Sequence, residues 1–397
     1  MLFKNLSTGS IIGLWALFAC TFTALTSEVA PVGILIDMAQ TFHIQEGQAG
    51  LAVSAFALMV AVGAVPLTIM TAHIDRKQLM LLSLSGYVLS NLVVAMAPTF
   101  LLLCVGRLLG GLAHALLMSI VSAYAARLVA PSMTGRAISF VYGGTSLGAI
   151  LGVPGTAAIG HLASWRVAMY IMTGLAVVLT ICIAFFLPPV PSTVHVKESL
   201  PSISSRKVMR TFLIVVGVDA IFFFAHNLLY TYVTPLLLDH GLSSNVLSIA
   251  LLLTGAVSIL GLWGAGHLVD RRPAGGMLAS GMAMLIGMGL MYGHILSGWM
   301  SVGAVGLWCI GYSAMIPFVM SGAIRARATR SDVAGAAINA ASNAGILLGS
   351  AAGGIVLTHG GFAVLTPLAM GVALCGILLA FFSPSAFPHI LHSSEYD

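Results

Sequence analysis

Two charged side chains lie inside long apolar stretches of this sequence. Glu28 falls in an otherwise hydrophobic run at 11–36, and Arg107 falls in another at 99–124. A charge at bilayer depth is costly and is retained where it faces a cavity, an ion path or a partner of opposite charge. The two residues therefore predict a pathway for a solute or an ion through a membrane protein.

Helix geometry places these two charges at one depth. At a rise of about 1.5 Å per residue, Glu28 and Arg107 each lie about 12 Å below the outer end of their helix. An ion pair between them, direct or through water, would lower the cost of each charge. Because a carboxylate whose partners change with conformation also changes its proton affinity, Glu28 is the first candidate for a proton carrier. A fixed structural pair is the alternative.

Asp219 is the other acid deep in an apolar run, about 13 Å from the inner end of its helix. It is the second candidate for proton coupling, and a polar residue bonded to neighbouring helices is the alternative. Further polar and aromatic residues lie in the apolar runs, and such side chains suit a sugar or a similarly polyhydroxylated solute. The residues expected to line a substrate cavity are His114, Tyr142, His226, Asn227, Tyr230, Asn339 and Asn343.

Composition excludes a soluble protein. Of the 397 residues, 59% are hydrophobic and 7% are charged, with a mean hydropathy of +1.05, whereas soluble domains carry about 25% charged residues. Apolar stretches of roughly 20 residues recur, each long enough to cross about 30 Å of hydrocarbon as a helix. The predicted spans are 11–36, 46–71, 79–97, 99–126, 135–159, 166–187, 210–238, 244–268, 276–296, 299–323, 333–357 and 362–382.

Basic residues predict the orientation of these spans. With the N-terminus inside, most loop lysines and arginines fall on the cytoplasmic side, whereas Arg166 lies at an outer loop. We therefore expect a multi-pass protein of the cell inner membrane with both termini cytoplasmic. The net charge of +5 is accounted for by this topology, so we expect no nucleic-acid partner. The five cysteines show no metal-like spacing, and we expect no metal, disulfide or cofactor.

The chain contains an internal repeat. Asp75-Arg76 follows the second predicted span and Asp270-Arg271 follows the eighth, while three glycines at four-residue spacing in the fifth span recur in the eleventh at nearly the same offset. Duplicated six-helix halves are a known plan of secondary transporters. The pattern predicts an all-α membrane protein of two pseudo-symmetric six-helix bundles. The predicted parts are an N-terminal bundle at 1–187, a cytoplasmic linker at 188–209, a C-terminal bundle at 210–382 and a cytoplasmic tail at 383–397.

The twelve spans, the central linker and the Asp-Arg loops resemble the major facilitator superfamily over essentially the whole chain. Three segments are similar to its twelve-helix drug:proton antiporters, especially the sugar-efflux, arabinose-exporter-like branch. They are TSEVAPVGIL at 26–35, GRLLGGLAHALLMSI at 106–120 and GAILGVPGTAAIGHLASWR at 148–166. The loop motif departs from the family pattern, because Thr71 replaces its first glycine and Gln78-Leu79 its later Gly-Arg. Gly266 restores the glycine in the second half.

This resemblance implies roles for two further groups of residues. The loop charges would form a latch that closes the cytoplasmic side, with simple membrane anchoring as the alternative; they are Asp75, Arg76, Arg136, Asp270 and Arg271. The fifth span carries an antiporter-like motif that would bend and seal the cavity, and close helix packing is a compatible explanation. Its residues are Gly148, Gly152, Pro154 and Gly155.

The expected function is proton-coupled export of sugars or drugs across the membrane by alternating access. The partners would be a small-molecule substrate, protons and the lipid bilayer, and we expect a monomer. One alternative is an exporter of purines, nucleosides or a single antibiotic such as a phenicol. Another is a substrate-gated importer or a membrane receptor. An enzyme is not expected, because no nucleophile and base occur in a recognisable order and no phosphate-binding loop is present.

Overall fold

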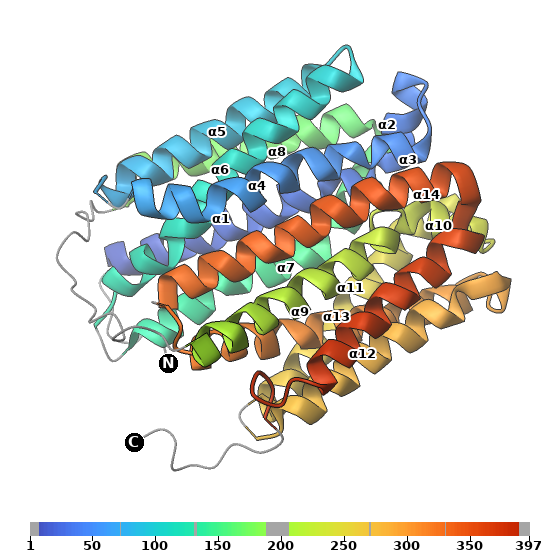
Figure 1. Ribbon diagram of the computed structural model, residues 1–397. Helices are drawn as coiled ribbons and strands as arrows, with labels where there is room; N and C mark the ends of the chain where they lie inside the picture. Colours follow the sequence, from blue (N-terminus) through green and yellow to red (C-terminus); the bar gives the residue numbers. More distant parts are fainter. Residues whose placement is uncertain are drawn as a thin grey trace. The chain divides into compact units, whose positions relative to one another are not determined.

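The computed structural model describes residues 8–71, 73–130, 133–187, 206–269, 271–329 and 331–388, and the secondary-structure elements in these ranges are helical (Figure 1). Within them, eleven helices are long and apolar enough to cross a membrane. The predicted linker at 188–209 and tail at 383–397 lie mostly outside the described residues.

Contacts divide the chain into two compact units. The first comprises Met1–His43 and Ala55–Lys197, and the second comprises Ile44–Ser54 and Glu198–Asp397. The helices of the first unit are α1 (Thr8–Gly33), α2 (Leu35–Phe42), most of α4 (Leu51–Met70), α5 (Arg76–Met96), α6 (Phe100–Arg127), α7 (Thr134–Leu162) and α8 (Trp165–Phe186).

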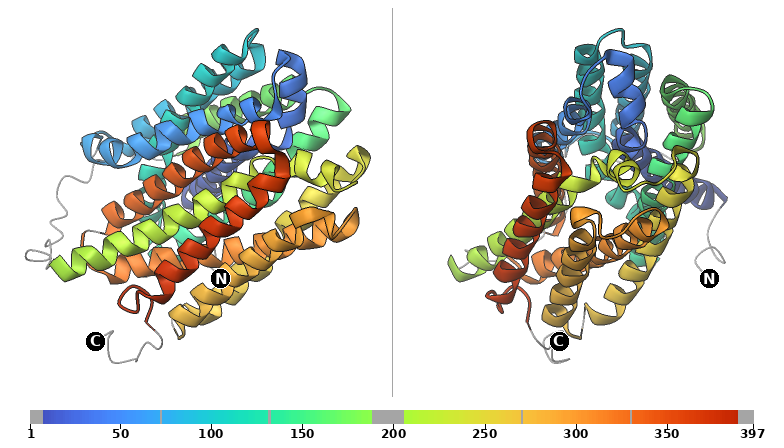
Figure 2. Two further views of the ribbon diagram at one scale, coloured as in Figure 1. Left: turned by 45° about the vertical axis from the view of Figure 1, so that its right-hand side comes forward. Right: turned by 90° about the vertical axis from the view of Figure 1, so that its right-hand side faces the viewer.

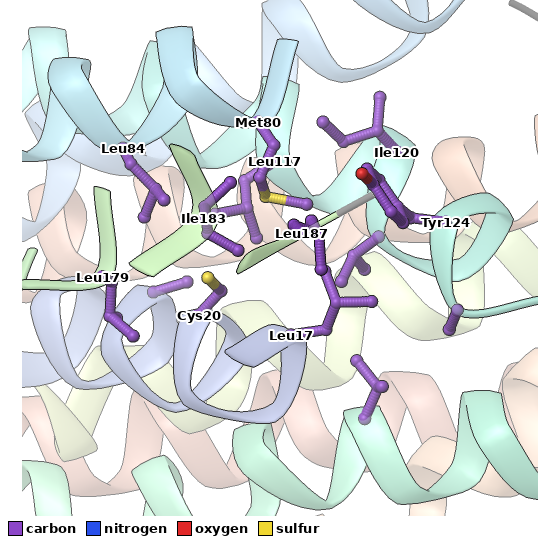
Figure 3. Packing of buried hydrophobic residues seen from close by; sticks show 14 of the residues in the cluster. Leu17, Cys20, Met80, Leu84, Leu117, Ile120, Tyr124, Leu179, Ile183 and Leu187 are labelled. Atoms are coloured by element: carbon purple, nitrogen blue, oxygen red, sulfur yellow. The ribbon is translucent and has the colours of Figure 1, made fainter. Parts of the chain in front are cut away.

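The core of the first unit is formed by large apolar side chains from α1, α5, α6 and α8 (Figure 3). Each of these helices contributes residues about one turn apart, which places them on one helix face. The residues at its centre include Leu17, Cys20, Met80, Leu84, Leu117, Ile120, Tyr124, Leu179 and Ile183. Cys20 packs there as a small apolar residue.

The second unit is built from longer helices with short helical connections. Its elements are α3 (Glu46–Ala49), α9 (Arg206–Tyr230), α10 (Val233–Asp239), η2 (Ser244–Val246), α11 (Leu247–Leu268), α12 (Pro273–Leu290), η3 (Tyr292–His294), α13 (Trp299–Arg325) and α14 (Ser331–Phe381). The predicted span at 210–238 is interrupted after Tyr230 and continues as α10.

Helix α14 accounts for two predicted spans. It is 51 residues long, and Gly361 inside it has φ 61° and ψ −168°, a conformation that is essentially restricted to glycine. Figures 1 and 2 show the chain turning back at this end of the helix. The eleven long helices therefore accommodate the twelve spans predicted from hydropathy.

The segment 44–54 associates with the second unit although it precedes the first-unit part of α4. The Tyr232 hydroxyl donates to the backbone carbonyls of Ser350 (2.6 Å) and Gly47 (3.3 Å), and the Ser54 and Ser350 hydroxyls lie 2.6 Å apart. Gly47 and Gly354 also approach closely, since a Cβ on either would meet the carbonyl oxygen of the other. Hydropathy places this segment at the start of the second span and contains no signal for these contacts.

The repeated glycines occupy equivalent packing positions in the two units. In α7, a Cβ on Gly144 would meet the carbonyl oxygen of Phe18, and one on Gly148 would meet that of Phe22. The glycines of α14 lie against α9 in the same way; the pairs are Gly345 with Ala220, Gly349 with Phe224 and Gly353 with Leu228. Small residues thus allow α7 to contact the backbone of α1 and α14 that of α9.

The α7 glycines allow a matched test of this packing. We expect Gly144→Ala to lower stability by about 1–3 kcal/mol, because the added methyl group collides with the α1 backbone. Gly155→Ala on the same helix should be neutral or stabilising, since a Cβ there meets no atom within 4 Å. The check is thermal unfolding of both variants in detergent. Equal melting temperatures for the two variants would contradict the packing role of Gly144.

Candidate functional site

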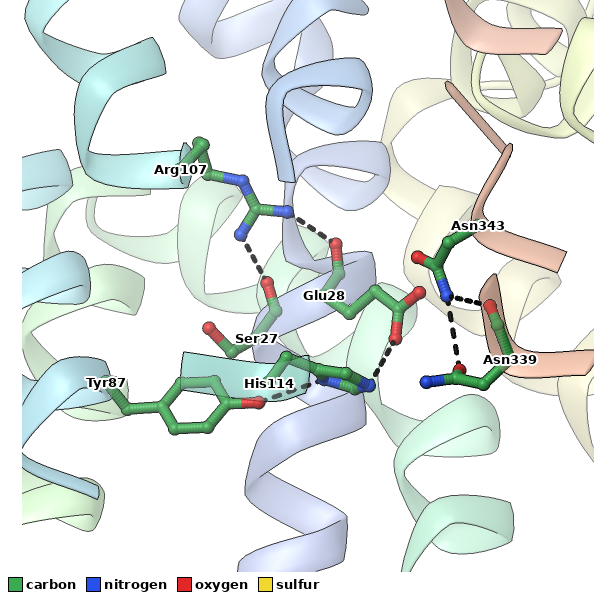
Figure 4. Close-up of polar contacts among 7 residues, drawn as sticks. All are labelled: Ser27, Glu28, Tyr87, Arg107, His114, Asn339 and Asn343. Carbon is green, nitrogen blue, oxygen red and sulfur yellow. Dashed lines mark hydrogen bonds and ion pairs between the residues drawn. The ribbon is translucent and has the colours of Figure 1, made fainter. Parts of the chain in front are cut away.

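Pro31 leaves one carbonyl group of α1 without its usual donor, and Arg107 binds it. Proline has no amide N–H, so the Ser27 carbonyl four residues earlier cannot receive its helical hydrogen bond. The Arg107 guanidinium donates to this carbonyl oxygen at 2.6 Å and to the Glu28 carbonyl oxygen at 2.7 Å (Figure 4). Arg107 is 1% exposed. Its fork of donors therefore holds the interrupted turn of α1 that carries Glu28.

The Glu28 carboxylate faces a histidine. Its Oε2 lies 3.6 Å from Nε2 of His114 on α6, and the other ring nitrogen, Nδ1, lies 2.9 Å from the Tyr87 hydroxyl on α5. A neutral imidazole has one donor and one acceptor nitrogen, so a tyrosine proton donated to Nδ1 leaves Nε2–H directed at Glu28. The Tyr87 hydroxyl and His114 are within hydrogen-bond distance, whereas the wider contact between His114 and Glu28 is an ion pair when the histidine is protonated (Figure 4).

The contact between Glu28 and Arg107 differs in its acceptor from the predicted ion pair. The two residues are neighbours as expected, but the hydrogen bond between them ends on the backbone oxygen of Glu28. Phe56 of α4 packs against both Arg107, whose guanidinium carbon lies 4.4 Å from the ring centroid, and His114. Arg107 and His114 are seven residues apart, about two helical turns, and thus share one face of α6.

Sequence reasoning missed Tyr87 and Asn91 at this site. Asn91 Oδ1 accepts a hydrogen bond from the Ser27 hydroxyl at 2.9 Å, next to the residue that carries the site carboxylate. Polar residues one turn apart in an otherwise apolar span were the available signal. Tyr142, predicted to line the cavity, packs partly buried against the core of the first unit, and its cavity role stays a prediction.

The described latch residues differ in exposure. Asp75 is exposed at the N-cap of α5, with no side-chain capping bond. Arg76 is buried, whereas Arg136 and Arg271 are exposed. Asp270 lies outside the described residues, so the second half of the latch is not seen. The latch remains a prediction.

In the second unit, Asp219 is fully buried between α9 and α14. Its Oδ2 accepts a hydrogen bond from Ser342 at 2.7 Å, and its Oδ1 has no hydrogen-bond partner among the described residues. A buried carboxylate is stable only when it is neutral or well compensated. The proton-coupling role of Asp219 stays a prediction, and Ser342 is an additional contact that the sequence did not reveal.

A stack of aromatic rings surrounds His226. Tyr312 of α13 lies 3.6 Å from its ring centroid and nearly parallel to it, Tyr230 stacks at 4.5 Å, and Trp308 approaches edge-on at 5.2 Å. The faces of the imidazole are covered, so its edge is the part available for hydrogen bonding. His226 Nδ1 and Trp308 Nε1 are buried without hydrogen-bond partners among the described residues. Sequence reasoning found His226 and Tyr230 but not the α13 rings.

The three asparagines predicted to line the cavity form hydrogen bonds within their own helices. Asn227 Nδ2 donates to the Phe223 carbonyl of its own helix at 3.0 Å. Asn343 Nδ2 donates to the Asn339 carbonyl at 3.0 Å and to its side-chain oxygen at 3.3 Å (Figure 4). Asn339 and Asn343 therefore form one polar step on α14, as expected for residues one turn apart, while Asn227 is occupied by its own helix.

Comparison with known proteins identifies the family. The family model described as Major Facilitator Superfamily matches residues 17–338. The chain belongs to the major facilitator superfamily. It is accordingly a multi-pass membrane transporter of small molecules, not an enzyme.

Relatives within this superfamily include efflux proteins. Two chloramphenicol efflux pumps from strains of Mycobacterium tuberculosis are 31% and 30% identical to the chain, and each match covers 94% of both sequences. Among solved structures, a bacterial homologue of the human lysosomal transporter Spinster aligns over 96% of this chain and 98% of its own with a TM-score of 0.73 and 16% identity. The Escherichia coli fucose:proton symporter aligns over 94% of this chain and 99% of its own with a TM-score of 0.63 and 16% identity. These structures confirm the transporter fold.

Proposed function

We propose that this transporter exports aromatic, drug-like solutes such as phenicols in exchange for protons. The observation that carries the proposal is the group of titratable side chains in the first unit, in which Glu28 lies at ion-pair distance from His114 and His114 lies at hydrogen-bond distance from Tyr87. Acid and histidine series within membrane helices are typical of proton relays. In this account Glu28 takes up a proton in one conformation and releases it in another.

The substrate class is supported by the aromatic stack in the second unit. Its outer rings, Tyr230 and Tyr312, are partly exposed, so a planar ring of the substrate can extend the stack while His226 bonds a polar group. Chloramphenicol, the compound in the name of the curated relatives, carries such a ring and a diol. This favours drugs, and the phenicol alternative in particular, over sugars among the substrates that the sequence left open.

The remaining features of the proposal follow from topology. We propose that both termini are cytoplasmic, that the protein acts as a monomer in the cell inner membrane, and that the loop charges around Asp75 latch the cytoplasmic side in the state open to the outside. A latch must break in each cycle, and partly exposed ion pairs of about 0–1 kcal/mol suit that task.

A flux measurement tests the function. Purified protein in proteoliposomes, with an imposed pH gradient, should drive radiolabelled chloramphenicol against the proton flow, and a protonophore should abolish the drive. Arabinose serves as the comparison solute and should not be transported. Arabinose flux without chloramphenicol flux would restore the sugar-exporter hypothesis. Chloramphenicol flux unaffected by the protonophore would exclude proton coupling.

A further inference from the structure

A groove of about 560 Å³ lies along the beginning of α9 in the second unit. Five of its lining residues come from the first three turns of α9, and Leu379 comes from near the end of α14. The α9 residues are Arg206, Met209, Arg210, Leu213 and Ile214. Their spacing of three and four residues places all five on one helix face.

One part of the groove is lined by basic side chains and the other by apolar side chains. Arg206 and Arg210 form its first part, at the end of a helix that is long and apolar enough to cross a membrane. Leu213, Ile214 and Leu379 form the second part. About 12 Å of helix rise separates Arg206 from Ile214, so a single ligand can contact both parts.

The charged part of the groove is suited to an anion. The first turn of α9 contains no acidic residue, and the acid further along the helix, Asp219, is fully buried against α14. The two arginines are exposed at the helix N-terminus, where the backbone dipole adds further positive potential. The apolar part has the opposite preference, because it gains free energy by covering hydrocarbon.

We propose that this groove binds an anionic glycerophospholipid. Arg206 and Arg210 hold the phosphate, and an acyl chain lies along Leu213, Ile214 and Leu379. Basic pockets between membrane helices that continue into apolar walls are suited to such lipids. A zwitterionic lipid offers no net charge to the two arginines, and a soluble phosphate offers nothing to the apolar part. The site is distinct from the proposed proton and substrate residues, since none of them lines the groove.

Native mass spectrometry of the full-length protein in detergent tests this site. The probe is phosphatidylglycerol, with phosphatidylcholine of the same chain length for comparison. We expect the wild type to retain phosphatidylglycerol preferentially and Arg206→Gln/Arg210→Gln to lose about tenfold or more in affinity for it, since each arginine near an anionic lipid contributes about a factor of five. Lys207→Gln is the matched control, because this exposed lysine carries the same charge in the same turn but does not line the groove.

Two kinds of outcome would overturn the proposal. Equal affinities of the double variant and the wild type, or an equal loss in Lys207→Gln, would show that the groove does not select the lipid. Displacement of phosphatidylglycerol by millimolar inorganic phosphate would show a site for free anions in which the apolar walls play no part. Neither outcome depends on transport, so the test is independent of the proposed function.

Discussion

Glu28→Gln is expected to abolish pH-driven export while leaving solute binding nearly unchanged. Glutamine keeps the shape of glutamate and can still face His114, but it cannot take up and release a proton. Export in proteoliposomes under an imposed pH gradient should therefore fall to the level of protein-free vesicles, whereas chloramphenicol binding should persist. Glu46→Gln is the matched control, because Glu46 begins α3, outside the buried group.

A result that would contradict this account involves Asp219, the buried acid of the second unit. If Glu28→Gln retains full pH-driven export and Asp219→Asn loses it, the proton is carried by the carboxyl that Ser342 contacts. The expression level and melting temperature of Glu28→Gln distinguish a proton-carrying role of Glu28 from a purely structural one. A large loss of stability with little effect on coupling would make Glu28 a structural residue.

Arg107→Ala is expected to destabilise the first unit strongly, and Pro31→Ala should reverse part of the loss. Removing the guanidinium leaves the Ser27 and Glu28 carbonyls without this donor, and each buried polar group left unsatisfied costs about 1–3 kcal/mol. Alanine at position 31 returns an amide N–H that can bond the Ser27 carbonyl within α1. The two substitutions should therefore be coupled by about 1 kcal/mol or more in a double-mutant cycle of unfolding in detergent.

A second proline supplies the control for this cycle. Pro66 lies inside α4 and is not part of the Arg107 contacts, so Pro66→Ala should combine additively with Arg107→Ala. Additivity for Pro31 as well would contradict the assignment of Arg107 as the donor that replaces the missing amide. Arg107→Lys should be intermediate, because one ammonium group lacks the planar fork that reaches both oxygens.

Hydropathy was sufficient to predict the helices, since each crossing requires a long apolar stretch whatever its neighbours are. The glycine repeat was equally readable, because close backbone contact excludes larger side chains at Gly144 and Gly345. The association of 44–54 with the second unit was not predictable. Its contacts through Tyr232 and Ser350 depend on helix packing that no local pattern specifies.

The sequence predicted which residues form the candidate site but only some of the contacts between them. Charged residues inside apolar runs indicated Glu28, Arg107 and Asp219. Pairing by opposite charge did not predict that Arg107 binds backbone carbonyl oxygens of α1. Pro31 was the overlooked signal, since a proline inside a span implies a carbonyl that needs another donor. The contacts of His114 with Tyr87 and of His226 with Tyr312 depend on helix rotation, which spacing along one helix does not determine.

The most direct test of proton exchange at Glu28 is proton release on substrate binding. Purified protein in weakly buffered detergent solution is mixed with chloramphenicol while a pH indicator reports released protons. If proton and substrate compete, substrate binding releases a proton from Glu28. The solution should therefore become more acidic with the wild type and with Glu46→Gln, but not with Glu28→Gln at equal substrate occupancy. Equal proton release from the wild type and Glu28→Gln would contradict the account.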